Sequence, residues 1–207
     1  IKGCHRVECE GAELLSTGLR HDREWMIVEL DGKFITQRTD AVLATLLPAI
    51  DAEGQALKVT APGRAALRVP FAAQGNRCTV RVWKDVCEAV DQGDEAAEWF
   101  SALIGRPLRL VRFASDSVRH ADPLFARDDD APVKFSDAYP VLVTQIASLA
   151  ALNAAIGAPG TAPTEAPLPM TRFRPNIVLA GLTPFDEDHI DRLRVRDVVL
   201  RLAKPST

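Results

Sequence analysis

A succession of short β-strand patterns is the feature that most limits what this chain can fold into. Residues 24–30 and 33–38 flank Asp31-Gly32, a dipeptide typical of the tight turn in a β-hairpin. A second turn is predicted at Pro62-Gly63, and a third at Arg196-Asp197. Further segments have strand patterns at residues 56–60, 66–69, 77–83, 108–113, 176–179, 192–195 and 198–202. The sequence therefore predicts a β-rich α+β fold.

Helical patterns are fewer, and they occur at residues 41–47, 95–104 and 145–156. Asp94 and Thr144 are candidate N-caps, because their side-chain oxygens can accept from the first free amides of a helix. Gly105 follows one pattern, as is common at helix ends, and Pro48 ends another. The apolar stripes on these helices indicate core packing.

Two segments of the chain show no helical or strand pattern. Residues 115–134 mix cations with a run of aspartates, and residues 158–170 carry four prolines without periodicity. The first segment is expected to separate a β-rich N-terminal part from a mixed C-terminal part.

The composition narrows the class of protein. The 207 residues are 47% apolar and 26% charged, with a net charge of −3, as expected for a soluble globular protein without nucleic-acid partners. No apolar run approaches the ~18 residues of a membrane span. The four cysteines have no CxxC spacing, so we expect reduced thiols and a cytoplasmic protein. Their positions are Cys4, Cys9, Cys78 and Cys87.

Common catalytic motifs are absent from the sequence. It contains no GxSxG, GxGxxG, phosphate-loop or HExxH pattern, and its four histidines are too scattered for a metal site. What remains is a set of cations near predicted strand ends. If these cations converge, they would bind a phosphorylated or otherwise anionic small molecule. They are Lys2, Arg20, Arg23, Arg38, Arg172 and Arg174.

A polar cluster at the start of the strand 176–179 is the most specific of these signals. Arg174 offers a planar fork for phosphate, and Asn176 offers both a donor and an acceptor. Pro175 between them favours an extended conformation at Arg174. The alternative is a surface ion pair between Arg174 and the acidic segment 186–188.

Five segments, in order along nearly the whole chain, resemble the MOSC-domain family, which includes the mitochondrial amidoxime-reducing component and its bacterial relatives. Ile1-Lys2-Gly3-Cys4 resembles the opening (Tyr/His)-Pro-(Ile/Val)-Lys-Ser, and residues 18–26 are similar to the family's Gly-Leu-x-x-Asp-Arg-x-Trp box. The other three segments are residues 34–38, residues 135–149, and residues 173–176 with 185–188. The resemblance implies an N-terminal β-barrel-like domain (residues 1–113) packed on an incomplete MOSC-type β-barrel domain (residues 114–207).

The resemblance also implies a molybdenum cofactor bound through its pterin and phosphate. Gly3 replaces the family's serine, and Asp22 would orient Arg23 rather than touch the ligand. The implied cofactor contacts are Lys2, Gly3, Arg23, Ala138, Tyr139, Arg174, Asn176 and Thr207. Ala138 and Tyr139 would act mainly through their backbone groups.

The family's molybdenum-ligating cysteine is expected two residues beyond Thr207, and none of the four cysteines takes its place. This chain would then be a part, inactive alone, of an oxidoreductase that reduces N-hydroxylated small molecules. Its electrons would come from a 2Fe–2S ferredoxin-like domain, a flavoprotein reductase or a cytochrome. Two alternatives are a molybdopterin-binding or sulfur-carrier module without turnover, and a β-rich scaffold whose arginines form surface ion pairs.

Overall fold

The computed structural model describes two compact units of a β-rich α+β fold. Unit 1 comprises Ile1–Ala121 and Asp130–Pro140, and unit 2 comprises Asp122–Asp129 and Val141–Thr207. The residues described are 1–72, 75–126, 131–157 and 167–205.

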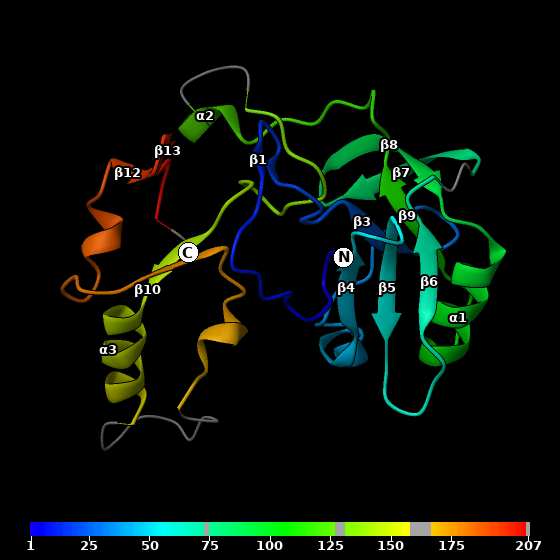
Figure 1. Ribbon diagram of the computed structural model, residues 1–207, viewed down its shortest axis with the longest axis horizontal. Coiled ribbons are helices and arrows are strands. Elements are labelled where there is room, and N and C mark those ends of the chain that lie inside the picture. The colour runs from blue at the N-terminus through cyan, green and yellow to red at the C-terminus, as the bar shows by residue number, and fades with distance from the viewer. Residues whose placement is uncertain (73–74, 127–130, 158–166, 206–207) are drawn as a thin grey trace. The chain divides into compact units, whose positions relative to one another are not determined.

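Unit 1 is built on two antiparallel sheets and a small hairpin (Figure 1). The larger sheet has the order β3-β9-β8-β7, with bounds Trp25–Val28, Arg109–Phe113, Asp85–Asp91 and Arg77–Val82. The smaller sheet has the order β4-β5-β6, with bounds Leu47–Asp51, Ala56–Thr60 and Leu67–Pro70. The hairpin pairs β1 (Leu14–Leu15) with β2 (Gly18–Leu19).

Strand β3 is buried on both of its faces. Successive side chains of a strand point to opposite sides, so Trp25 and Ile27 enter one apolar cluster while Met26 and Val28 enter another. The first cluster joins both sheets to helix α1 (Asp94–Ile104), which packs against β9 and β6 (Figure 1). The segment that enters β3 is therefore fixed by the core.

Helix α1 begins one residue earlier than predicted. Gly93 occupies the N-cap position without a side-chain cap, and Asp94 instead accepts a hydrogen bond from Arg109 at 2.8 Å. The predicted end is confirmed, because Gly105 follows the helix in the left-handed region with φ 88°.

Replacing Gly105 by alanine should lower the free energy of unfolding of unit 1 by about 1 kcal/mol. A Cβ at this position meets no atom within 4 Å, so the cost is that of holding alanine at positive φ. Urea unfolding followed by tryptophan fluorescence measures it. Gly11→Ala is the matched control, since a Cβ there also enters open space and Gly11 has no positive φ.

Unit 2 contains short elements with little buried apolar surface. Strands β10 (Val143–Gln145) and β11 (Ile177–Leu179) pair in parallel, and β12 (Arg192–Val195) pairs with β13 (Val198–Arg201) in a hairpin. The helical segments are α2 (Pro123–Ala126), α3 (Ile146–Ile156), and the 3₁₀ turns η2 (Met170–Arg172) and η3 (Asp186–Asp188). Among the described side chains of this unit, Ala126 is the one apolar residue that is fully buried.

Several predicted elements differ from the structure. Residues 33–38 contain isolated bridges at Lys33 and Phe34 rather than a strand. The predicted helix 41–47 is the 3₁₀ helix η1 (Ala41–Thr45), and strand β4, which follows it, was not predicted. Strands β8 and β10 were also missed, and Thr144 lies inside β10 instead of capping α3.

The expected barrels are not seen as closed structures. Every sheet among the described residues is open at both edges. No described helix combines the length and apolarity that crossing a membrane requires.

Candidate functional site

A buried lysine lies at the centre of the cationic part of unit 1. The backbone amide of Lys2 donates to Trp25 O at 2.8 Å, so β3 fixes its position. Its ammonium donates to Phe135 O at 2.8 Å and to Asp137 Oδ1 at 2.6 Å, and it lies 5.0 Å from the centre of the Phe34 ring. The Lys2 side chain is 5% exposed.

The environment of Lys2 favours its neutral form more than water does. Burial lowers the pKa of Lys2 to about 8, and the charges of Arg23 and Arg119 act in the same direction. The carboxylate of Asp137 opposes them and raises the pKa. Lys2 is therefore a cation at pH 7, but one that another anion would stabilise.

Arg119 holds the segment that carries Asp137. Its guanidinium donates to three backbone oxygens, those of Lys134 at 2.9 Å, Ser136 at 2.6 Å and Asp137 at 3.3 Å. It also forms an ion pair of 2.8 Å with Asp85 Oδ2. The Arg119 side chain is 5% exposed. Its hydrogen bonds therefore fix the backbone of residues 134–137 from the interior of the unit. The sequence analysis missed this role, because Arg119 lies in a segment without periodicity.

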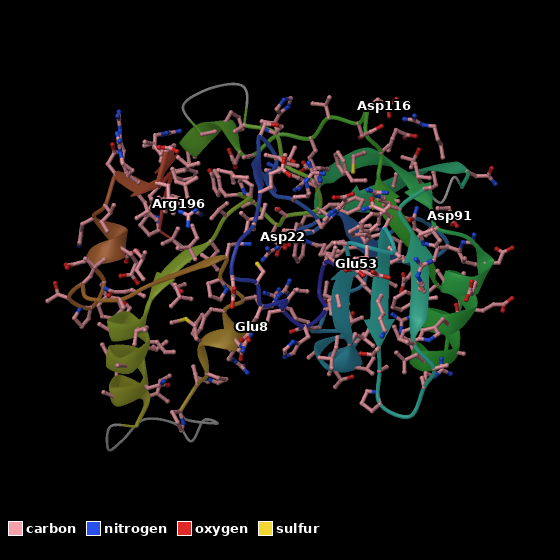
Figure 2. All side chains as sticks on the ribbon, viewed as in Figure 1. Glu8, Asp22, Glu53, Asp91, Asp116 and Arg196 are labelled. Atoms are coloured by element: carbon pink, nitrogen blue, oxygen red, sulfur yellow. The ribbon has the colours of Figure 1, made fainter. Side chains whose placement is uncertain are left out.

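Arg23 and Gly3 lie beside this cluster in unusual backbone conformations. Arg23 has φ 46° and pairs with Asp22 in the loop between β2 and β3, where Figure 2 labels Asp22. The carbonyl oxygen of Arg23 accepts from the amide of Phe135 at 3.1 Å. Gly3 has φ 85°, and its carbonyl accepts from Gln37 Nε2 at 2.6 Å. Positive φ at a non-glycine residue often marks a functional site.

A second charged network supports the loop that carries Arg23. Glu24 accepts from Arg112 Nε at 2.6 Å and from Lys134 Nζ at 2.9 Å. Burial alone would raise the pKa of Glu24, but its bonds and charge interactions with Lys134 and Arg112 lower it. Beside it, burial lowers the pKa of His21, which stacks on Phe71 at 4.8 Å. Two further ion pairs of this unit are the exposed pair Arg77–Asp116 and the partly buried pair Arg109–Asp91, and Figure 2 labels both aspartates.

In unit 2, Arg174 and Asn176 precede β11 as predicted, but with a different local conformation. Arg174 has φ 53°, so the extended backbone expected before Pro175 is wrong. Its amide donates to Thr171 O at 3.2 Å, and this turn overrides the proline preference. Asn176 Oδ1 accepts from the Leu142 amide at 3.0 Å, and this contact joins the start of β11 to β10.

A polar cluster close to β10 joins residues of two segments that carry the family resemblance, and these contacts were not predicted. The Gln145 side chain is buried and donates to Glu187 Oε2 at 2.9 Å. Ser148 Oγ donates to the same oxygen at 2.8 Å and accepts from the Phe185 amide at 2.8 Å. The acidic segment 186–188 is thus tied to α3, which is a structural role.

Five of the predicted site residues, Lys2, Gly3, Arg23, Ala138 and Tyr139, lie in unit 1. The contacts above link Lys2 and Arg23 to residues 135–137, whereas Ala138 and Tyr139 follow Asp137 along the chain. Ala138 is exposed and Tyr139 is half-buried. Arg174 and Asn176 belong to unit 2, and Thr207 lies outside the described residues.

The four cysteines are free thiols, as expected. Burial raises the pKa of Cys87 to about 11 and also raises that of Cys78. Cys4 is buried, and Cys9 is exposed. The described part of the chain contains no cluster of three histidine, cysteine or acidic residues able to hold a metal.

Alkylation at pH 8 should therefore modify Cys9 first. Its thiol is accessible, whereas Cys87 is buried and protonated at this pH. Mass spectrometry after short exposure to iodoacetamide should find the label on Cys9, and Cys9→Ser should remove the fast phase. Equally fast labelling of Cys87 would contradict the burial seen here.

Comparison with known proteins assigns both parts of the chain. The family model described as the MOSC N-terminal beta barrel domain matches residues 1–107, and the MOSC domain model matches residues 130–207. The chain is 32% identical to mitochondrial amidoxime reducing component 2 of Bos taurus, over 97% of this chain and 60% of that protein. It is 29% identical to mitochondrial amidoxime-reducing component 1 of Danio rerio, over 97% of this chain and 62% of the relative.

A further relative is the molybdenum cofactor sulfurase of Bos taurus, 26% identical over 99% of this chain and 24% of that protein. The chain thus spans about 60% of the length of the two amidoxime-reducing components and about a quarter of the sulfurase. A solved structure from Bordetella bronchiseptica aligns with a TM-score of 0.42 at 21% identity, over 56% of this chain and 98% of that one, too weak a likeness for any argument.

Proposed function

This chain belongs to the MOSC family, and from that premise we propose that it binds the molybdenum cofactor. We further propose that the complete polypeptide reduces N-hydroxylated small molecules. The observation that carries the proposal is the buried ammonium of Lys2, with the charges of Arg23 and Arg119 acting on it. A group of cations around a buried site favours a multiply charged anion such as a phosphate monoester.

The residues of unit 1 fit the anionic part of such a cofactor. Lys2 and Arg23 would hold its phosphate, with Asp137 and Asp22 as their present partners. The backbone of Gly3 can approach a ligand closely because it has no side chain. Ala138 and Tyr139 would add backbone contacts. Arg174, Asn176 and Thr207 remain sequence-based candidates.

The described residues do not fit the metal-binding part equally well. Molybdenum favours a thiolate ligand, because sulfur is soft and electron-donating. Cys87 and Cys78 have raised pKa values, which disfavours thiolate at these two positions. We therefore assign no metal ligand among the described residues. The cofactor, when bound, supplies the two-electron reduction, while the residues named above bind and orient it.

The electron donor is proposed to be a separate module or protein. The candidate donors are a 2Fe–2S ferredoxin-like domain, a flavoprotein reductase and a cytochrome, because each of these transfers electrons. A second candidate function is a cofactor-binding or sulfur-carrier module without reductase turnover. The similarity to a molybdenum cofactor sulfurase over 99% of this chain favours it.

The test is to purify the complete encoded polypeptide from a host that makes the cofactor and to measure molybdenum and released pterin. Stoichiometric metal and pterin, together with reduction of a model amidoxime by an artificial electron donor, support the oxidoreductase. Pterin without turnover supports the carrier module. Protein free of both metal and pterin overturns cofactor binding, and the same protein from a cofactor-deficient host is the blank.

A further inference from the structure

One carboxylate oxygen in unit 1 accepts from two donors of different kinds. Asp137 Oδ1 lies 2.6 Å from the ammonium of Lys2 and 2.8 Å from the indole nitrogen of Trp83. A cation and a neutral N–H donor that converge on one oxygen form the arrangement that proteins use to bind oxyanions. The position of this oxygen therefore marks where an oxygen of an anionic ligand could be held.

The backbone of Trp83 has a conformation that is sterically unfavourable for a bulky side chain. It occupies the two-residue turn between β7 and β8, where Val82 pairs with Asp85, and it has φ 55°. Glycine or asparagine is usual at such a position, and a bulky residue there is strained. The Trp83 ring is half exposed, so burial does not account for the choice of this residue. Strain kept at an exposed aromatic residue is typical of a binding site.

The two donors are fixed, whereas the acceptor is open to solvent. Lys2 is held by Phe135 O, and the Trp83 ring contacts Phe34 edge-on at 5.0 Å between centroids. The side chain of Asp137 is 64% exposed, against 5% for Lys2. An anion arriving from solvent can therefore replace the carboxylate without rearranging the donors.

We propose that Trp83 and Lys2 form an oxyanion-binding pair, and that the Asp137 carboxylate occupies the pair until a ligand phosphate displaces it. The inference deepens the proposed function and rests on it, since the ligand class is a phosphate monoester such as the one the cofactor carries. Trp83 is the new element, a ligand-contacting residue whose indole N–H is released from Asp137 to the ligand. Displacement exchanges the hydrogen-bond acceptor of Trp83, from the Asp137 carboxylate to the ligand, so its fluorescence reports binding.

The test is a titration of this chain with sulfate, a tetrahedral dianion whose charge does not change near neutral pH, at constant ionic strength. Binding is measured by calorimetry and by tryptophan fluorescence. Trp83→Phe should abolish the fluorescence response and weaken sulfate binding by about 2- to 10-fold, as expected for one neutral hydrogen bond. Asp137→Ala should strengthen binding by about 10-fold, because it removes the competing carboxylate.

Trp99→Phe is the matched control, because the indole nitrogen of Trp99 donates to Ala65 O at 2.8 Å rather than to Asp137. It should leave both the affinity and the response unchanged. Unchanged affinity in Trp83→Phe, or no gain in both Asp137→Ala and Asp137→Asn, overturns the inference. Trp83 and Asp137 are exposed, so these variants are expected to fold.

The outcomes separate this inference from the proposed function. Normal pterin content in the complete polypeptide carrying Trp83→Phe, with sulfate affinity also unchanged, overturns the role of Trp83 and leaves cofactor binding intact. Sulfate binding that responds to Trp83 and Asp137, in a protein that never acquires pterin, supports the oxyanion pair and overturns the cofactor assignment.

Discussion

Lys2→Met should weaken sulfate binding to unit 1 by about 10- to 100-fold, because a hydrogen bond from a charged donor contributes about 1.5–3 kcal/mol. Methionine keeps the apolar length of the side chain and removes the ammonium alone. The fold should tolerate the change, since it removes a buried charge and leaves Asp137 in contact with water. Calorimetry gives the affinity, and Lys58→Met is the control at an exposed lysine of β5. Equal sulfate affinity in wild type and Lys2→Met would exclude Lys2 from the anion site.

The same lysine predicts the pH dependence of binding. The groups that act on Lys2 are Asp137, which raises its pKa, and Arg23 and Arg119, which lower it together with burial. With a pKa of about 8, Lys2 is charged at pH 7 and becomes neutral as the pH rises through 8. Sulfate affinity should therefore fall between about pH 7.5 and 9 in the wild type and stay flat in Lys2→Met.

The strands whose patterns are regular could be predicted from the sequence. The bounds of β5 and β12 agree with the predicted segments, because apolar alternation and turn residues define both. Strand β8 was missed, since its two aspartates, its glutamate and its alanine have low strand propensity. It forms because β7 and β9 pair with its two sides. The pairing with β9 is distant in sequence and has no local signal.

The candidate site could likewise be predicted only in part from the sequence. The identity of Lys2, Arg23 and Arg174 as anion-binding candidates follows from residue type and from resemblance. Their conformations do not, because the left-handed φ of Arg23 and Arg174 depends on turns that only the fold defines. The contact between Trp83 and Asp137 joins residues 54 positions apart. In the sequence, Trp83 is simply the last residue of a strand pattern.

Arg119 is the residue whose replacement should destabilise unit 1 most among the charged groups around the site. Arg119→Met removes the ion pair with Asp85 and leaves the carbonyl oxygens of Lys134 and Ser136 without this donor. Losing buried, charge-assisted bonds of this kind costs about 3 kcal/mol.

Urea unfolding monitored by tryptophan fluorescence measures this loss, because all three tryptophans, Trp25, Trp83 and Trp99, belong to unit 1. Arg77→Met is the matched control. Arg77 is 53% exposed and pairs with the exposed Asp116 (Figure 2), so its replacement should cost about 0.5 kcal/mol or less. A similar small loss in Arg119→Met would mean that residues 134–137 hold their place without this guanidinium. The expected larger loss, accompanied by weaker sulfate binding at urea concentrations where the protein is still folded, would identify Arg119 as the positioning residue of the anion site.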